Sequence, residues 1–387
     1  EEAVARYEER TPGVKVRLVD LPYTGYHDWL QSQMLGREIP DIVMIDNGSA
    51  IRYGAYQGKL VDMTPYFERP NPYTGVRWSD MYYPQFILNA RDPVYRRNWI
   101  VSWASENTAY FYNKDAFRRA GVVQRDADGQ PVLDDDGREL VDEPRTWADL
   151  IDAFEKLREI GVYGEVSEFH PDAAPIIWQL PYYRKQLYDD LIPRYDTYTP
   201  DDFPDPFEIA EAVVEGRLDL RSPELAAPWR MIYDKSEYMA PGMTSMDIQQ
   251  AFEVFAGGRC ASIFWVSTDM ASFEEMCDFE LGVFPFPLLV GSPFYDGEYS
   301  EEFSLSAFEC SIPRNTETRG NLDAAIDFLH YFTSPEAQEI LSRESVCMSP
   351  IRGVPTPEKL KPFLTRMNQR GTHLITFDPF TIGIAKE

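Results

Sequence analysis

Aromatic and polar side chains suited to binding are more prominent in this sequence than groups suited to catalysis. Aromatic residues make up 14% of the chain, with 23 Tyr and 8 Trp, which is more than packing alone tends to require. Asp46 and Asn47 directly follow the apolar stretch 42–45, so a buried strand there would project them from its carboxyl end. Rings that stack on flat apolar faces, combined with carboxylates and amides, suit a surface that recognises hydroxylated rings.

The sequence contains no familiar catalytic motif, and paired carboxylates are the one catalytic arrangement that its composition leaves open. The sequence has no GxSxG elbow, HExxH motif, P-loop or paired Cys/His site, and its four histidines, at positions 27, 170, 330 and 373, are expected to be structural or exposed. The aspartates of 126–128 and 134–136 lack the spacing of a calcium-binding EF-hand loop. The 64 acidic residues could still supply the two carboxylates of a glycoside hydrolase, which is the strongest catalytic alternative.

Length and charge limit the architecture and the partners. A chain of 387 residues with 44% apolar side chains exceeds one ordinary hydrophobic core, so we expect two domains. The net charge of −27 repels phosphate backbones and anionic headgroups, which argues against nucleic acid as a partner. No stretch approaches the roughly 20 apolar residues that span a bilayer.

Both the start of the chain and its cysteines leave questions open. The sequence begins within an amphipathic helical pattern that has neither a cap nor an initiator Met, so we expect that an upstream segment has been removed. That segment could be a cleaved signal peptide or a lipoprotein leader. The four cysteines match no CxxC spacing and could pair in three ways, so a disulfide is possible.

Hydrophobic periodicity and turn signals predict alternating strands and helices. We expect strands at 14–19, 42–45, 99–103, 108–112, 261–266 and 281–284. We expect helices at 26–35, 49–57, 114–120, 147–157, 322–332 and 335–341, with helical segments dominating up to about residue 256. Thr146 is the expected N-cap of the fourth helix, and Gly121 should follow the end of the third. Residues 125–143, with two Asp-Gly turns, predict an exposed acidic hairpin.

Several motifs in a fixed order resemble one known family. They are RYEERTPGVKV at 6–16, PDIVMIDN at 40–47 with GKLVDMTPY at 58–66, AYFYNKDAF at 109–117 with RTWADL at 145–150, CSIPRN at 310–315, and AAIDFLHYFTSPEAQ at 324–338. Together they are similar to the family 1 extracellular solute-binding proteins of bacterial ABC transporters, the group that contains maltose-binding protein. The resemblance runs nearly from end to end.

The resemblance implies a fold and a division into domains. The expected fold is α/β and periplasmic-binding-protein-like, with two α/β lobes joined by a three-crossing hinge and a ligand cleft between them. The N-terminal lobe would comprise 1–107 and 283–326, with the family's first strand missing before Glu1. The C-terminal lobe would comprise 108–282 and 327–387.

The resemblance also implies which residues hold the ligand. Asp46 and Asn47 fall where the family places polar sugar contacts, each with helix capping as its alternative role. Trp178 falls on the expected cleft wall of the second lobe, with core packing as its alternative. Strand alternation puts Trp265 opposite Phe264, and we favour Trp265 as the stacking residue although the sequence around it departs from the family pattern. In resembling proteins the acidic residue at the position of Glu106 faces the cleft near the hinge, so Glu106 is a predicted contact, with a structural ion pair as its alternative role. The remaining predicted contacts are Trp103, Asn107, Tyr23, Tyr26 and Arg352, and surface exposure is the alternative for the two tyrosines and the arginine.

The function that the resemblance implies is binding without catalysis. A carbohydrate, most simply an oligosaccharide, would be captured by hinge closure and delivered to the permease subunits of an ABC transporter. The protein would act as a monomer without cofactor or metal, on the periplasmic or extracellular face of the cytoplasmic membrane, either free or lipid-anchored. The alternatives are a secreted carbohydrate hydrolase and a receptor of the same fold for a non-sugar solute.

Overall fold

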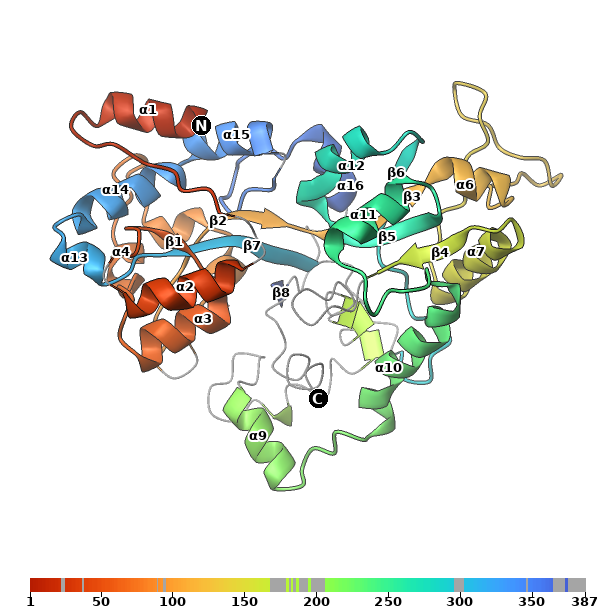
Figure 1. The fold of residues 1–387 in the computed structure, drawn as a ribbon, viewed down its shortest axis with the longest axis horizontal. Coiled ribbons are helices and arrows are strands. Elements are labelled where there is room, and N and C mark those ends of the chain that lie inside the picture. Colours follow the sequence, from red (N-terminus) through yellow and green to blue (C-terminus); the bar gives the residue numbers. More distant parts are fainter. Residues whose placement is uncertain are drawn as a thin grey trace. The chain divides into compact units, whose positions relative to one another are not determined.

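The computed structural model describes residues 1–21, 25–36, 38–88, 90–92, 95–167, 179–180, 182–183, 186–187, 194–195, 206–295, 303–345, 347–364 and 373–374. The chain forms two compact units (Figure 1). Unit 1 contains Glu1–Glu106, Ser304–Lys361 and Thr372–Thr376, and unit 2 contains Asn107–Phe303, Pro362–Gly371 and Phe377–Glu387. Up to Leu364, the chain passes between the units after Glu106, Phe303 and Lys361, as the three expected crossings require.

Unit 1 is built on a small sheet whose strand order brings distant segments together. Strand β7 (Phe303–Ser311) lies between β1 (Val43–Met44) and β2 (Val101–Glu106), and β8 (His373–Leu374) also pairs with β7. Both β1 and β2 run antiparallel to β7, with Met44 and Val101 each opposite Cys310. Strands β1 and β2 are therefore parallel to each other, and their carboxyl ends lie at the same edge of the sheet.

Helices cover this sheet and form the core of unit 1. They are α1 (Glu2–Arg10), α2 (Tyr26–Leu35), α3 (Asn47–Ile51), the π-helix η1 (Arg52–Tyr56), α4 (Thr64–Phe67), η2 (Trp78–Met81), α5 (Pro84–Leu88), α13 (Asn315–Thr318), α14 (Leu322–Phe332), α15 (Pro335–Ser345) and η6 (Glu358–Leu360). Helix α16 (Lys361–Leu364) begins at Lys361 of this unit and continues into unit 2. Helix α1 lies beside α15 in Figure 1 and buries Ala3 and Tyr7. The Tyr7 hydroxyl donates to Asp327 at 2.9 Å, which fastens the first helix to α14.

The strand predicted at 14–19 is not formed. The segment lies outside every sheet, and its backbone groups are used locally. Val14 N donates to Thr11 O at 3.1 Å and Val16 N donates to the Glu8 carboxylate at 2.8 Å. Since a strand exists only by pairing with a neighbour, an apolar alternating sequence is not sufficient to form one.

Unit 2 contains a mixed four-stranded sheet. Its order is β4 (Tyr163–Val166), β5 (Cys260–Val266), β3 (Thr108–Asn113) and β6 (Leu281–Phe284). Strand β4 is parallel to β5, whereas β3 is antiparallel to both of its neighbours. The carboxyl ends of β4, β5 and β6 therefore share an edge with the start of β3. The sequence analysis missed β4, because its four residues include Gly164 and Glu165 and lie in a stretch where helices were expected.

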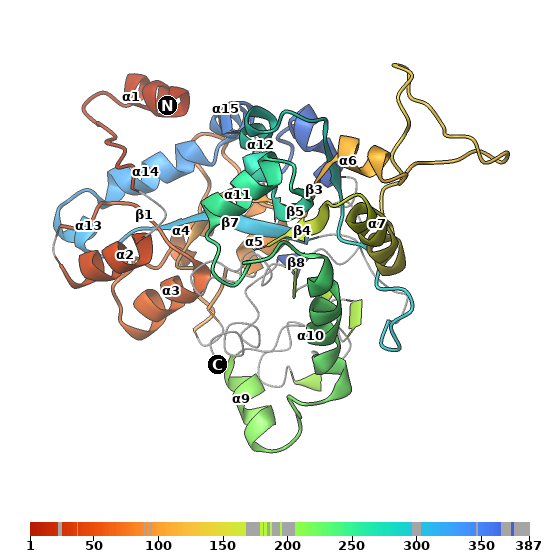
Figure 2. The same ribbon diagram turned by 45° about the vertical axis from the view of Figure 1, so that its right-hand side comes forward.

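Two helix ends in unit 2 agree with the sequence prediction. The described helices that begin in this unit are α6 (Lys114–Arg119), α7 (Trp147–Glu159), α9 (Pro206–Val214), α10 (Pro223–Lys235), η4 (Ser236–Tyr238), α11 (Ile248–Ala256), η5 (Ser267–Asp269) and α12 (Met270–Met276). Thr146 and Asp149 form a reciprocal capping box at the start of α7. Gly121, at a φ of 74°, follows α6 as predicted. Residues 122–142 form the expected hairpin arm, which extends away from α6 and α7 (Figure 2).

The boundaries of the units differ from the predicted lobes. Strand β6 pairs with β3, so residues 283–303 group with unit 2 rather than with the N-terminal lobe. Helices α14 and α15 lie against α1, so residues 327–361 group with unit 1. Pairing and packing over long sequence distances decide these boundaries. The four cysteines are free thiols, of which all but Cys277 are buried.

Candidate functional site

The end of β1 in unit 1 carries two of the predicted ligand contacts. Asp46 is the N-cap of α3, and its Oδ1 accepts from Ser49 N at 2.8 Å. Tyr26 begins α2 and donates its hydroxyl to Met44 O at 2.8 Å, and burial raises the pKa of Tyr26 to about 12. Asn47 is the first residue of α3. Asp46 therefore caps α3 through Oδ1, and its other carboxylate oxygen, Oδ2, takes no part in this bond.

Strand β2 brings two further candidates to the same edge. Ile45 N donates to Glu309 O and Ser102 pairs with Glu309, so β1 and β2 are level on either side of β7. Trp103, one residue further along β2, is half-buried, and its ring lies 5.1 Å from that of Phe308 and 5.3 Å from that of Phe332.

Glu106 ends β2 and is half-buried. Burial raises the pKa of the Cys347 thiol to about 11, and the charge of Glu106 adds to this shift. Unit 1 therefore gathers Tyr26, Asp46, Trp103 and Glu106 on two parallel strand ends and the helices beside them. Arg352 lies elsewhere along unit 1, exposed on a turn whose backbone N donates to Met81 O at 2.8 Å.

Asn107 and Trp265 lie in unit 2 and are buried. Asn107 is 5% exposed, and its Nδ2 donates to Phe363 O at 2.9 Å. Trp265 is 4% exposed, and its Nε1 donates to Asp269 Oδ2 at 2.5 Å. Its ring meets Phe252 of α11, whereas Phe264 meets Tyr110, Tyr182 and Phe286. The predicted alternation of Phe264 and Trp265 is therefore confirmed. Trp178 and Tyr23 lie outside the described residues.

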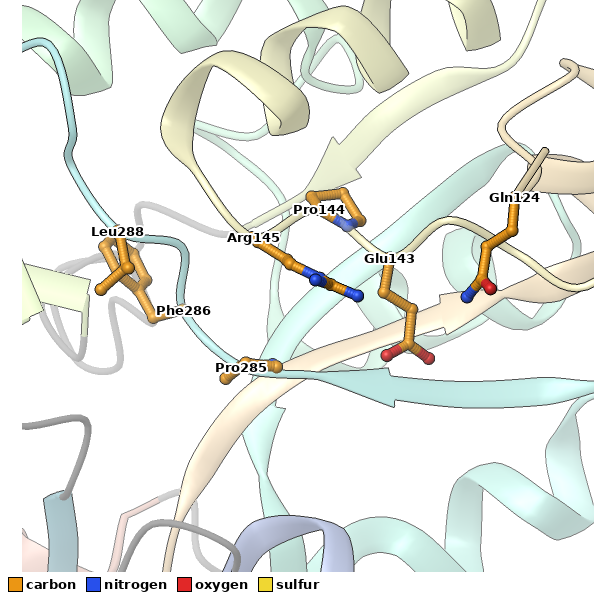
Figure 3. Close-up of a pocket in the computed structure, with 7 residues that line it drawn as sticks. All are labelled: Gln124, Glu143, Pro144, Arg145, Pro285, Phe286 and Leu288. Carbon is orange, nitrogen blue, oxygen red and sulfur yellow. The ribbon is translucent and has the colours of Figure 1, made fainter. Parts of the chain in front are cut away.

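A pocket of 260 Å³ opens in unit 2 where strand β6 ends. Gln124, Glu143 and Arg145 supply an amide, a carboxylate and a guanidinium, and their polar tips point toward a common space (Figure 3). The apolar part of the lining is formed by Pro144, Pro285, Phe286 and Leu288. This combination of hydrogen-bonding groups and apolar surface suits a small hydroxylated molecule.

Neighbouring bonds hold the walls of this pocket in place. The Tyr112 hydroxyl donates to Glu143 Oε1 at 2.8 Å, and burial raises the pKa of Tyr112 above its usual range. Leu288 N donates to Arg145 O at 2.9 Å, and Trp147 N donates to Leu288 O at 2.7 Å. Among the predicted contacts that the structure describes, none lines the pocket. The sequence signals near it are the RTWADL motif, which begins at Arg145, the predicted hairpin that ends at Glu143 and the predicted strand 281–284.

Unit 2 also contains a buried network of four polar side chains that was not predicted from the sequence. Lys235 donates to Gln179 Oε1 at 2.7 Å and to the Tyr110 hydroxyl at 3.1 Å. Gln179 Nε2 in turn donates to Glu165 Oε1 at 2.8 Å. All four side chains are fully buried. These residues come from β3, β4, α10 and an intervening segment, so no local pattern indicates that they meet.

Comparison with solved structures shows the fold. A chitin oligosaccharide binding protein matches with a TM-score of 0.70 and 15% identity, covering 100% of this chain and 87% of its own. UgpB from Mycobacterium tuberculosis, in complex with glycerophosphocholine, matches with a TM-score of 0.68 and 18% identity, covering 100% of this chain and 87% of its own. Maltose-bound MalE3 from T. maritima matches with a TM-score of 0.68 and 15% identity, covering 99% of this chain and 87% of its own.

Sequence comparison identifies the family. No helix among the described residues is long and apolar enough to cross a membrane. A search of curated proteins by sequence found no match. The profile of the bacterial extracellular solute-binding proteins matches residues 1–339, which is most of the chain. Together with two α/β units and the shared fold, this match means that the chain belongs to the family of bacterial extracellular solute-binding proteins.

Proposed function

We propose that this protein is the carbohydrate-binding component of an ABC importer, which captures an oligosaccharide and hands it to a membrane permease without altering it. The observation that carries the proposal is the shared edge of the unit 1 sheet, where Asp46 follows β1 and Trp103 and Glu106 lie on β2. Ligands of α/β proteins bind at the carboxyl ends of strands, which is where these residues lie. The family is extracellular, so the protein works outside the cytoplasmic membrane.

The chemistry of this edge suits a sugar. Carboxylates such as those of Asp46 and Glu106 accept hydrogen bonds from adjacent hydroxyls, and charge makes these bonds stronger than neutral ones. An indole such as that of Trp103 covers the flat C–H face of a sugar ring. Micromolar affinity requires about −8 kcal/mol, which a few such contacts supply after the cost of ordering.

Proteins of the same fold support a saccharide as the ligand. The structures with similar folds include a chitin oligosaccharide binding protein, RafE bound to raffinose and MalE3 bound to maltose. The first is named as a binding protein, and the other two are described as holding a sugar. UgpB, which holds glycerophosphocholine, shows that the same fold accepts a different solute. The edge residues of unit 1 are acidic, which favours a neutral polyol over a phosphodiester.

The pocket of unit 2 supplies a second group of suitable side chains. The side chains of Glu143 and Arg145 are exposed and line the pocket. Among the described residues, no side chain or backbone group is hydrogen-bonded to the Arg145 guanidinium. Vicinal hydroxyls pair with such groups in a bidentate manner. We include Glu143 and Arg145 among the sugar contacts of the proposed function.

Capture would proceed by hinge closure in a monomer. If only the closed form lets both units contact the sugar, the ligand shifts the equilibrium toward closure by its differential affinity for the two forms. The closed form would then be the state that the permease recognises. No step of this mechanism requires a cofactor.

Isothermal titration calorimetry of the purified protein tests the proposal. The ligands are maltose, raffinose, chitin oligosaccharides and glycerophosphocholine, and the release of reducing sugar is measured in the same samples. Saturable binding of one saccharide without product supports the proposal. Turnover would replace it with the hydrolase, and binding of glycerophosphocholine alone would replace the carbohydrate with a phosphodiester.

A further inference from the structure

The crossing from unit 1 to unit 2 is unusually short. Strand β2 ends at Glu106 in the sheet of unit 1, and strand β3 begins at Thr108 in the sheet of unit 2. Asn107 is the single residue between them. Any rotation of one unit against the other must therefore be absorbed by the backbone at or beside this residue.

Within unit 2, Asn107 is held by three hydrogen bonds. Its N–H donates to Ser267 Oγ at 3.1 Å, and its carbonyl accepts from Ser267 N at 2.7 Å. Its Nδ2 donates to Phe363 O at 2.9 Å, which fixes the orientation of the amide because a carbonyl can only accept. Ser267 is fully buried just after β5, so Asn107 is attached to the sheet of unit 2.

The bond to Phe363 joins two of the three crossings. Phe363 lies two residues after Lys361, where the chain passes from unit 1 to unit 2 again. Its ring is buried and lies 5.7 Å from that of Phe111 in β3. One side chain, Asn107, therefore connects the first crossing to the segment that follows the third.

On the unit 1 side, the same crossing is held two residues before Asn107. Ser105 N donates to Met348 O at 2.7 Å, and Met348 N donates to Ser105 O at 3.1 Å. The chain is thus fastened at Ser105 within unit 1 and at Asn107 within unit 2. Glu106 is also paired with Leu305 of β7, so the backbone between Glu106 and Asn107 is where the two attachments meet.

We propose that Asn107 is a positioning residue of the hinge, whose side-chain amide couples two interdomain crossings into one pivot. This role differs from the predicted ligand contact, and it rests on the bond from Asn107 Nδ2 to Phe363 O and on the burial of Asn107. This role rests on the proposed function only in that hinge closure would serve to capture the sugar. The coupling itself is a property of the protein without ligand.

A matched control exists in unit 1. Asn71 is also buried, and its Nδ2 donates to a backbone carbonyl, His330 O, at 2.8 Å. Its replacement by Ala removes the same type of bond, together with the bond that Asn71 Oδ1 accepts from Tyr73 N at 2.9 Å, at a place far in sequence from the crossing at Asn107. Both Asn71→Ala and Asn107→Ala should lower thermal stability, but only Asn107→Ala should change how the units move.

Double electron–electron resonance on the ligand-free protein measures this difference. Spin labels are attached at Glu9→Cys and Glu159→Cys, two exposed positions in different units, with Cys277→Ser removing the one native thiol that is not buried. We expect wild type and Asn71→Ala to share one distance distribution. In Asn107→Ala, the weight of a second distance population should rise about fivefold, the change in an equilibrium that one typical hydrogen bond produces.

A distribution for Asn107→Ala that superimposes on wild type would overturn the inference. If Asn107→Ala does not fold, Asn107→Ser provides a less disruptive variant, and hydrogen exchange on the wild type provides a test without substitution. The amides of Asn107 and Ser267 should then be protected as strongly as those of β3 and β5. Rapid exchange of both would count against the pivot. Failure of every sugar to bind would contradict the proposed function and leave these measurements unaffected.

Discussion

Lys235 and Glu165 form an ion pair that is completely removed from solvent. The distance from Lys235 Nζ to Glu165 Oε2 is 2.7 Å, and both side chains are 0% exposed. Burial lowers the pKa of Lys235, although the carboxylate of Glu165 opposes that shift. The Tyr110 hydroxyl also donates to Glu165 Oε2, at 3.0 Å. The pair joins α10 to β4 and anchors the helix to the sheet of unit 2.

Breaking this pair from one side should destabilise the protein strongly. Lys235→Met leaves a buried carboxylate without its cation, and we expect a loss of roughly 3–5 kcal/mol in the free energy of unfolding. The double variant Lys235→Met/Glu165→Gln should lose less than the sum of the single variants, because no unpaired charge is left. Chemical denaturation of the four proteins measures these values.

The exposed pair of Lys156 and Asp152 provides the control. It has the same distance of 2.7 Å, but its side chains are 41% and 60% exposed. Lys156→Met should cost no more than about 1 kcal/mol, since water screens the pair. Equal losses for Lys156→Met and Lys235→Met would contradict the argument from burial.

The two roles of Asp46 can be separated by two substitutions. Asn caps helices as well as Asp does, so Asp46→Asn should preserve the bond from Ser49 N and the stability of α3. Asp46→Ala should cost about 1 kcal/mol in stability. If Asp46 contacts the sugar through its charge, both variants should weaken binding in calorimetry. Wild-type affinity in Asp46→Asn would restrict Asp46 to capping.

Glu106 should contribute to ligand affinity and little to stability. A hydrogen bond to a charged group contributes roughly 1.5–3 kcal/mol, so Glu106→Gln should weaken binding about 10-fold or more. Glu159→Gln, at an exposed position at the end of α7, is the control and should bind as wild type does. Titration of both variants with the saccharide bound by wild type measures the ratio. Unchanged affinity in Glu106→Gln would remove Glu106 from the site.

The stability of the protein should fall in mild acid because of His330. Burial lowers the pKa of His330 from 6.5 to about 4, while the nearby charge of Asp327 acts in the opposite direction. The unfolded chain binds a proton as pH falls through 6.5, whereas the folded protein does not until about pH 4. The contribution of His330 is therefore complete above pH 6.5 and is lost between pH 6.5 and 4, by roughly 3 kcal/mol.

His330→Phe tests this dependence. The His330 ring lies 4.2 Å from that of Trp78 in an edge-to-face arrangement, which Phe can reproduce without titrating. Urea midpoints measured from pH 7 to pH 4 should decline more steeply in wild type than in the variant. Parallel curves would show that other groups dominate acid unfolding.

Local structure in this protein could largely be predicted from the sequence. The helix Trp147–Glu159 begins at Thr146, and strand Leu281–Phe284 has its predicted bounds. Caps, turns and apolar periodicity act over a few residues, so they are present in any short window of sequence. The order of the family motifs also predicted membership in the solute-binding family, which the match over residues 1–339 confirms.

The sequence by itself determined the family, the helices that begin at Tyr26, Trp147, Leu322 and Pro335, and the ends of strands β5 and β6. Only the tertiary structure decided which residues meet. Lys235 joins Glu165 across 70 positions, Asn107 joins Phe363 across 256, and Val14–Val19 is not a strand because no neighbour pairs with it. Such contacts depend on how separate elements assemble, and the free energy of burial and pairing that selects them belongs to the whole unit rather than to any segment.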